Sequence, residues 1–284
     1  MPDIGAIEHA SDFPLDIVFW RPADETLTRH RNPMFSRELG VTPSRSVVVD
    51  LLHAVYLGIL LVWSRVTIWA LISAGAYGDA NTREGIFAAV LVLRSRLMRF
   101  YPVYERAHQE TLTRVADFTP TMIGSADNPQ LKTKGAETWG VALFLIAELK
   151  EKYSMIPNSE GARLMHAGQS LEQVIRIWKG AGWVMPARLQ EEAFERMVIF
   201  VDLMRVFEAY VPKFHLVFHA LSETGTKGNP WFYSSWLDEA LNKQLKGCCR
   251  NASAQTFDET VLLKMREVLK EEVSCVKARK RHRD

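Results

Sequence analysis

The chain has 284 residues, 48% of them apolar and eight of them tryptophan, and its formal net charge at pH 7 is +2. This composition excludes a disordered chain and provides enough apolar sequence for one large domain or two small ones. The near-neutral charge excludes a whole-chain electrostatic field that attracts nucleic acid. The three cysteines match neither a disulfide framework nor a zinc spacing, which indicates reduced thiols in an intracellular protein.

Residues 1–45 are predicted to form an irregular N-terminal segment, because proline recurs throughout them and leaves little room for a long helix. Leu15–Trp20 is the stretch in which a short strand is expected, and the basic run Arg29–Pro33 is predicted to be an exposed loop. The first residues include acidic side chains and lack a basic region followed by an apolar one, so no secretory signal is expected.

Ser46–Gly78 is a long apolar stretch that is interrupted by the charge of Arg65. A membrane span needs about 18 to 20 uncharged residues, and the apolar runs on either side of Arg65 are shorter. A core helix enclosed by others is favoured instead, because apolar residues recur three and four positions apart. A third interpretation adds a function. In it, Asp50 ends a strand after a β-branched run, and His53 lies on the first turn of the following helix. Both side chains would then project at the carboxyl end of a strand, where functional sites in α/β layers gather.

Helical periodicity and caps predict further helices beyond this stretch. Asn81 and Thr82 are cap candidates for the first, which Pro102 should kink or break. The predicted inner face of this helix consists of Phe87, Val90, Leu91, Leu97, Met98 and Tyr101. The predicted ranges are 83–115, Lys132–Tyr153, Gly161–Lys179, Ala187–Tyr210, a helix after Ser235, and Phe257–Lys277. Thr119–Asn128 is predicted to be a loop. The connections favour a mostly helical bundle in one domain over residues 46–270, followed by a basic tail at 271–284.

Basic residues gather in two places. Arg94, Arg96 and Arg99 are predicted to form an exposed basic side of their helix, for which solvation is favoured over phosphate binding. If this side does bind phosphate, these three arginines are candidate DNA-binding residues. The tail is either a solvated terminus or a nuclear-import or phosphate-binding segment. Its candidate DNA-binding residues are Lys277, Arg279, Lys280, Arg281 and Arg283.

His215 and His219 are four residues apart and therefore share a face if the segment is helical. Histidines at this spacing can bind a metal, but the Glu of the H-E-x-x-H motif is absent. The sequence therefore favours structural histidines that are satisfied by hydrogen bonds.

Three segments together resemble the cut-and-paste DDE transposases of eukaryotes. They are the D-x-x-H motif Asp50–His53, the segment Pro212–His219, and Trp236–Asn242 with its E-x-x-N motif. In that family the first motif precedes a helical insertion that interrupts an RNase H-like core, and the last lies on the helix of the final catalytic glutamate. The resemblance implies a mainly α fold that is insertion-domain-like, with a small remnant of an RNase H-like α/β layer around residues 46–56 and 213–246.

The same resemblance implies roles for individual residues. Glu239 would be the catalytic, metal-binding carboxylate with Mg²⁺ as cofactor, while Asp50 and His53 would brace the site. The family also needs two earlier aspartates on core strands, and Asp16 is the candidate with strand character. We therefore expect a nuclear, DNA-associated protein without a membrane partner, an incomplete transferase that lacks independent catalysis. The alternative is a non-enzymatic helical module that binds DNA or protein.

Overall fold

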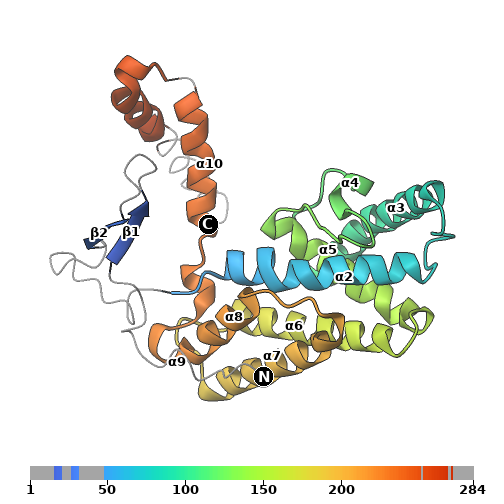
Figure 1. Ribbon diagram of the computed structural model, residues 1–284. Helices are drawn as coiled ribbons and strands as arrows, with labels where there is room; N and C mark the ends of the chain where they lie inside the picture. Colours follow the sequence, from blue (N-terminus) through green and yellow to red (C-terminus); the bar gives the residue numbers. More distant parts are fainter. Residues whose placement is uncertain (1–15, 21–26, 32–47, 251, 268–269, 271–284) are drawn as a thin grey trace. The chain divides into compact units, whose positions relative to one another are not determined.

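The computed structural model describes residues 16–20, 27–31, 48–250, 252–267 and 270. It is mainly helical, as predicted, and divides into two compact units, residues 1–233 and 234–284, which are described separately (Figure 1). The boundary between the units falls inside the range 46–270 for which the sequence predicted one domain.

The first unit contains a two-stranded antiparallel hairpin near its start. Strand β1 (Asp16–Trp20) covers the stretch in which a short strand was expected, and it pairs with β2 (Leu27–Arg31). Asp16 lies opposite Arg31, and Trp20 lies opposite Leu27. The prediction of a loop at Arg29–Pro33 is wrong for residues 29–31, because strand pairing extends the backbone through them.

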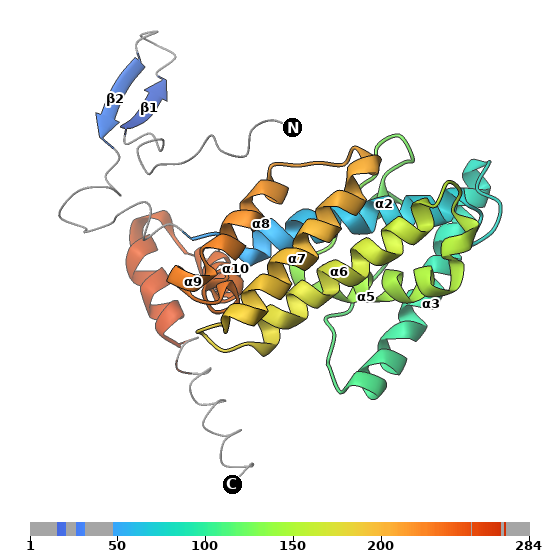
Figure 2. The same cartoon turned by 90° about the horizontal axis from the view of Figure 1, so that it is seen from below.

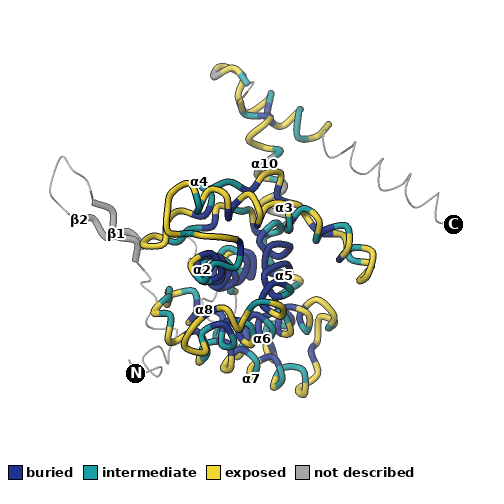
Figure 3. Tube along the Cα trace, turned by 90° about the vertical axis from the view of Figure 1, so that its right-hand side faces the viewer, coloured by how far each residue is buried: buried dark blue, intermediate teal, exposed yellow. Residues whose placement is uncertain are grey.

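A continuous apolar helical segment follows, formed by η4 (Leu52–Ile59) and α2 (Leu60–Ser73). By length and composition Leu52–Ser73 could cross a membrane, yet 72% of its most apolar window is buried by the rest of the structure. Figure 3 shows α2 buried among its neighbours. Trp63 Nε1 donates to the Leu164 carbonyl at 2.9 Å, and Trp69 Nε1 donates to the Ile123 carbonyl at 2.8 Å. This packing is that of the predicted core helix.

Helices α5 (Gly135–Lys152) and α6 (Glu160–Gly180) pack on this segment, and α7 (Ala187–Met204) runs beside α6 (Figure 2). Gly168 explains how closely α6 can approach α2. A Cβ at this position would lie 2.3 Å from Cζ2 of Trp63, which is far inside van der Waals contact. The large indole therefore fits because residue 168 has no side chain.

Helix α3 (Arg83–His108) begins at the predicted cap, where Thr82 Oγ1 accepts a hydrogen bond from Gly85 N at 3.0 Å. It ends at His108 rather than near residue 115, because Gln109 adopts a left-handed conformation with φ of 52°. Pro102 lies inside the helix and does not break it. Phe87 and Leu91 are exposed, contrary to the predicted inner face, which instead runs along Val90, Leu93, Leu97, Tyr101 and Tyr104.

Shorter elements complete the first unit. Helix α4 (Pro120–Ile123) forms one turn inside the predicted loop. Helix α8 (Lys213–Ser222) packs on η4 and α7 and leads into α9 (Thr224–Lys227). The remaining turns are η5 (Tyr153–Met155), η6 (Arg205–Phe207) and η7 (Pro230–Tyr233).

The second unit consists of α10 (Trp236–Arg250), η8 (Ala254–Thr256) and helical residues 257–267 in its described part. Cys248 and Cys249 on α10 are free thiols. Of the ranges predicted to hold an α/β remnant, residues 51–56, 213–227 and 236–246 are helical or turn, and residues 48–50 precede the helix without strand pairing. Residues 46 and 47 lie outside the described part of the chain.

Candidate functional site

The predicted pair Asp50 and His53 lies at the start of η4, where Asp50 caps the helix. Asp50 Oδ1 accepts a hydrogen bond from Leu52 N at 3.2 Å, and Oδ2 accepts one from His53 N at 3.1 Å. His53 Nδ1 lies in direct contact with Asp50 Oδ2. These contacts satisfy backbone donors that a helix start leaves free. The imidazole is 52% exposed and the carboxylate 26%, so neither is buried in the apolar segment that follows.

The helix that Asp50 caps is irregular at Gly58. Its φ and ψ of −116° and −110° are not helical, and η4 has π-helical turns, which recur at functional sites. Lys213 Nζ, from the start of α8, donates to the Leu57 carbonyl at 2.8 Å. A Cβ on Gly58 would lie 2.8 Å from Lys213 Cδ, so the glycine makes room for this side chain. Lys213, which belongs to the segment Pro212–His219, thus contacts the helix that follows the Asp50–His53 motif, at a point four residues beyond His53.

Glu239, the third predicted catalytic residue, lies on the first turn of α10 in the second unit. Its side chain is exposed, and its backbone N–H donates to the Ser235 carbonyl at 2.9 Å. Among the described residues, no group of three or more His, Cys, Asp and Glu side chains is arranged to hold a metal ion. A two-magnesium centre needs several carboxylate oxygens around the ions. The described residues do not fit such a centre, and no magnesium-dependent step is assigned to them.

Arg96, a predicted DNA-binding residue, belongs to a buried ionic cluster. Its Nε lies 2.8 and 2.9 Å from the two carboxylate oxygens of Glu148, which is buried on α5. Lys152 Nζ donates to Glu148 Oε2 at 2.9 Å, and the Tyr77 hydroxyl donates to the same atom at 3.1 Å. We call Tyr77, Arg96, Glu148 and Lys152 the Glu148 cluster. Burial, reinforced by the Glu148 charge, raises the pKa of Tyr77 far above its usual value, so the phenol stays a donor.

Arg94 does not share a face of α3 with Arg96 and Arg99. At about 100° per residue, Arg96 points about 160° away from Arg94, whereas Arg99, three residues after Arg96, points only about 60° away from it. Arg94 Nε pairs with Asp117 Oδ1 at 3.0 Å, and Arg99 donates to the carbonyl and hydroxyl of Ser95 on its own helix. The predicted basic side therefore holds only in part: Arg94 and Arg99 are exposed, but they point to different sides of α3, and Arg96 is bound to Glu148. The candidate residues from Lys277 to Arg283 lie outside the described part of the chain.

A second ionic cluster, which the sequence analysis missed, surrounds Glu110. Glu110 Oε1 accepts hydrogen bonds from Lys179 Nζ at 2.5 Å and from Trp139 Nε1 at 3.2 Å. Arg176 donates to the Tyr104 hydroxyl at 2.6 Å, and the cations of Arg176 and Lys179 each lie 5.7 Å from the Trp139 ring. We call these five residues the Glu110 cluster. Burial disfavours the charge on Glu110, but hydrogen bonds from Lys179 and Trp139 outweigh it and lower the pKa.

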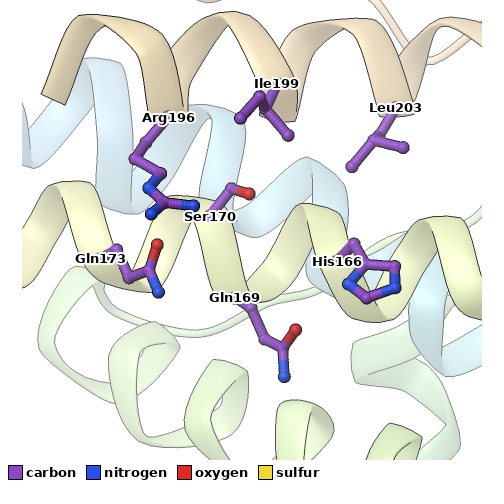
Figure 4. A pocket seen from close by; sticks show the side chains of 7 residues that line it. All are labelled: His166, Gln169, Ser170, Gln173, Arg196, Ile199 and Leu203. Atoms are coloured by element: carbon purple, nitrogen blue, oxygen red, sulfur yellow. The ribbon is translucent and has the colours of Figure 1, made fainter. Parts of the chain in front are cut away.

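A shallow pocket of about 330 Å³ lies between α6 and α7 (Figure 4). Arg196 reaches from α7 toward Ser170 and Gln173 on α6, as Figure 4 shows. In the part of the chain that the structure describes, Arg196 has no ion pair. The lining also includes His166, Gln169, Ile199 and Leu203. Such a set of donors can hold a small acidic group, and the only sequence signal for it is the three- and four-residue spacing along each helix.

The comparisons with known proteins add no identification. No protein family, curated protein or solved structure matches the chain.

Proposed function

We propose that the chain is a transposase-derived, DNA-associated protein, an incomplete DDE polynucleotidyl transferase without independent catalysis. The observation that supports it most is the contact between α8 and the helix that begins at the D-x-x-H motif, made through Lys213 and the Leu57 carbonyl. The resemblance relates the same two segments, at the entry to a helical insertion and at the return from it. Lys213 and Leu57 are 156 residues apart in sequence, and helices fill the interval.

The residues divide between bracing and catalysis in this proposal. Asp50 and His53 brace the start of the apolar helix, since both Asp50 oxygens accept hydrogen bonds from the turn they cap. Glu239 is the carboxylate inherited from the catalytic helix, and its place on the first turn of α10 lets the helix dipole favour its charge. The arginine-rich tail supplies phosphate contacts, because the α3 arginines are engaged within the protein or with their own helix.

The test is DNA binding by the full chain, measured as fluorescence anisotropy of a labelled duplex at increasing salt. We expect the affinity to fall steeply with salt, by a slope of about 0.9 per phosphate contact. Replacing the tail cations with Gln should flatten that slope, while Glu239→Gln should leave it unchanged. Absence of binding at low salt would overturn the DNA association.

A cleavage assay with Mg²⁺ on the same duplex addresses catalysis separately. We expect intact DNA with the wild-type chain. Strand cleavage that Glu239→Gln abolishes would contradict the lack of independent catalysis, and it would at the same time support the transposase origin.

A second candidate function is that of a non-enzymatic protein-binding module. Apolar side chains are exposed along α7 at Phe194, Val198 and Ile199, which is unusual for a helix face in contact with water alone. The DNA titration separates the two functions. No affinity for duplex at low salt favours the protein-binding module.

A further inference from the structure

Helix α8 carries a pair of histidines whose ring nitrogens converge. Nε2 of His215 and Nε2 of His219 are 2.8 Å apart, and the rings are nearly perpendicular, with centroids 4.5 Å apart. His215 is exposed and His219 half-buried, so solvent reaches the pair. Neither ring has another hydrogen bond or ion pair among the described residues. The sequence favoured structural histidines, but these two satisfy only each other, at the surface.

The backbone that carries the pair is held firmly. Phe214 and Val217 are buried on the opposite side of α8, and the Phe214 ring stacks on Phe200 of α7 at a centroid distance of 5.7 Å. Lys213, one residue earlier, is tied to the Leu57 carbonyl. Two ligands on an anchored helix turn therefore need little ordering when an ion binds.

We propose that His215 and His219 form a binding site for a divalent transition metal ion, with Cu²⁺ preferred over Ni²⁺ and Zn²⁺. Metal–nitrogen bonds of about 2.0 to 2.1 Å at 90° place the two nitrogens about 2.9 Å apart, whereas tetrahedral zinc needs about 3.3 Å. The separation of 2.8 Å matches the square-planar or octahedral arrangement. Imidazole suits these ions, while Mg²⁺ requires oxygen ligands, so the site is independent of the magnesium expectation for Glu239.

Binding is chemically balanced without loss of a proton. One ring now donates its Nε2–H to the other, and it moves that proton to Nδ1 when the metal takes the Nε2 lone pair. Both imidazoles then remain neutral, each with one metal–nitrogen bond. Water fills the remaining coordination positions, because the described residues offer no third ligand of the His, Cys, Asp or Glu type.

Isothermal titration of the full chain with NiCl₂, and electron paramagnetic resonance with one equivalent of CuCl₂, test the site. We expect His215→Gln and His219→Gln each to weaken Ni²⁺ binding about tenfold or more and to change the copper spectrum from two nitrogen ligands to one. His166→Gln is the matched control, since His166 is an exposed histidine on α6 that has no hydrogen bond to a second histidine in the described part of the chain. It should bind as the wild type does.

Thermal unfolding provides a second readout. Ni²⁺ should raise the Tm of the wild-type chain and of His166→Gln, because the ion binds the folded helix turn, and neither α8 variant should respond. MgCl₂ should have no effect on any of them. Equal Ni²⁺ affinity in the wild type and the His215→Gln/His219→Gln double variant would overturn the proposal, as would an equal loss in the His166 control.

Discussion

The Glu148 and Glu110 clusters use nearly the same chemistry in different surroundings. Each holds one glutamate between two cations and a tyrosine hydroxyl, and each joins helices that are distant in sequence. The Glu148 side chain is only 5% exposed, whereas that of Glu110 is 20% exposed. Ionic interactions are weaker where water reaches them. Disrupting the Glu148 cluster should therefore lower the free energy of unfolding more than disrupting the Glu110 cluster.

The clusters also connect different parts of the fold. Glu148 joins α5 to Arg96 on α3 and to Tyr77, which follows α2. Glu110, in the segment after α3, binds Lys179 on α6 and Trp139 on α5. The Glu148 cluster thus links α5 to α3 and to the segment after α2, and the Glu110 cluster is more accessible to solvent.

Glu148→Gln should produce the largest loss. It leaves Arg96 and Lys152 without their shared buried counter-charge, so we expect the free energy of unfolding to fall by about 3 to 5 kcal/mol. Urea denaturation followed by circular dichroism measures this. Glu151→Gln is the control, because Glu151 contacts the same two cations but is 67% exposed, and its loss should be about 0.5 kcal/mol or less. Equal losses in the two variants would contradict the contrast.

Glu110→Gln should cost less, about 1 to 2 kcal/mol, because water can replace part of what the carboxylate provides. The same denaturation experiment checks it. Trp139→Phe is a useful comparison. It removes the indole N–H that donates a hydrogen bond to Glu110, and it keeps most of the ring surface under Arg176 and Lys179. A loss for Glu110→Gln as large as that for Glu148→Gln would show that burial does not separate the clusters.

Low pH should reduce the stability of the wild type more than that of Glu110→Gln. The pKa of Glu110 is lowered in the folded protein, so below about pH 4.5 the unfolded chain takes up its proton first. The stability that this carboxylate contributes is therefore complete above the unfolded pKa and is lost as the pH falls through the folded one. Urea midpoints at pH 7 and pH 4 should differ less in Glu110→Gln than in the wild type. An equal difference would show that Glu110 is not linked to folding.

Sequence periodicity predicted much of the fold but neither ionic cluster. The range predicted for α6, Gly161–Lys179, agrees with Glu160–Gly180 because its apolar spacing and flanking turns are local signals. The Glu148 cluster depends instead on Arg96 meeting a residue 52 positions away. A periodic pattern shows which face of a helix is apolar, and it does not show which partner the polar side chains meet.

In the candidate site too, local features were predictable from the sequence and contacts between distant residues were not. The proximity of Asp50 and His53 was predictable, since residues three apart at a helix start meet through the cap. The irregular turn at Gly58 was not, because it accompanies a contact with Lys213 from far along the chain. The prediction that Phe87 and Leu91 face inward was wrong for a related reason. Apolar residues lie on more than one face of α3, and tertiary packing buries only one of these faces.

Asp50→Ala tests the partly exposed carboxylate at the start of the core helix. Loss of a helix cap costs about 1 kcal/mol, so we expect a reduction near that value, well below that of Glu148→Gln. Asp50→Asn should retain most of the stability, because an amide oxygen still accepts from the turn. Denaturation curves for the two variants give the comparison. Equal losses would indicate that the charge beside His53 matters more than the cap.

Arg94→Gln should have the smallest effect, and it completes the contrast between exposed and buried pairs on one helix. Arg94 pairs with Asp117 in the open, where water and salt screen the charges, so its removal should change the free energy of unfolding by about 0.5 kcal/mol or less. Arg96→Gln, two residues away, should cost several times more because it leaves Glu148 buried with one cation fewer. A loss above about 1 kcal/mol for Arg94→Gln would mean that the Asp117 pair anchors the segment after α3.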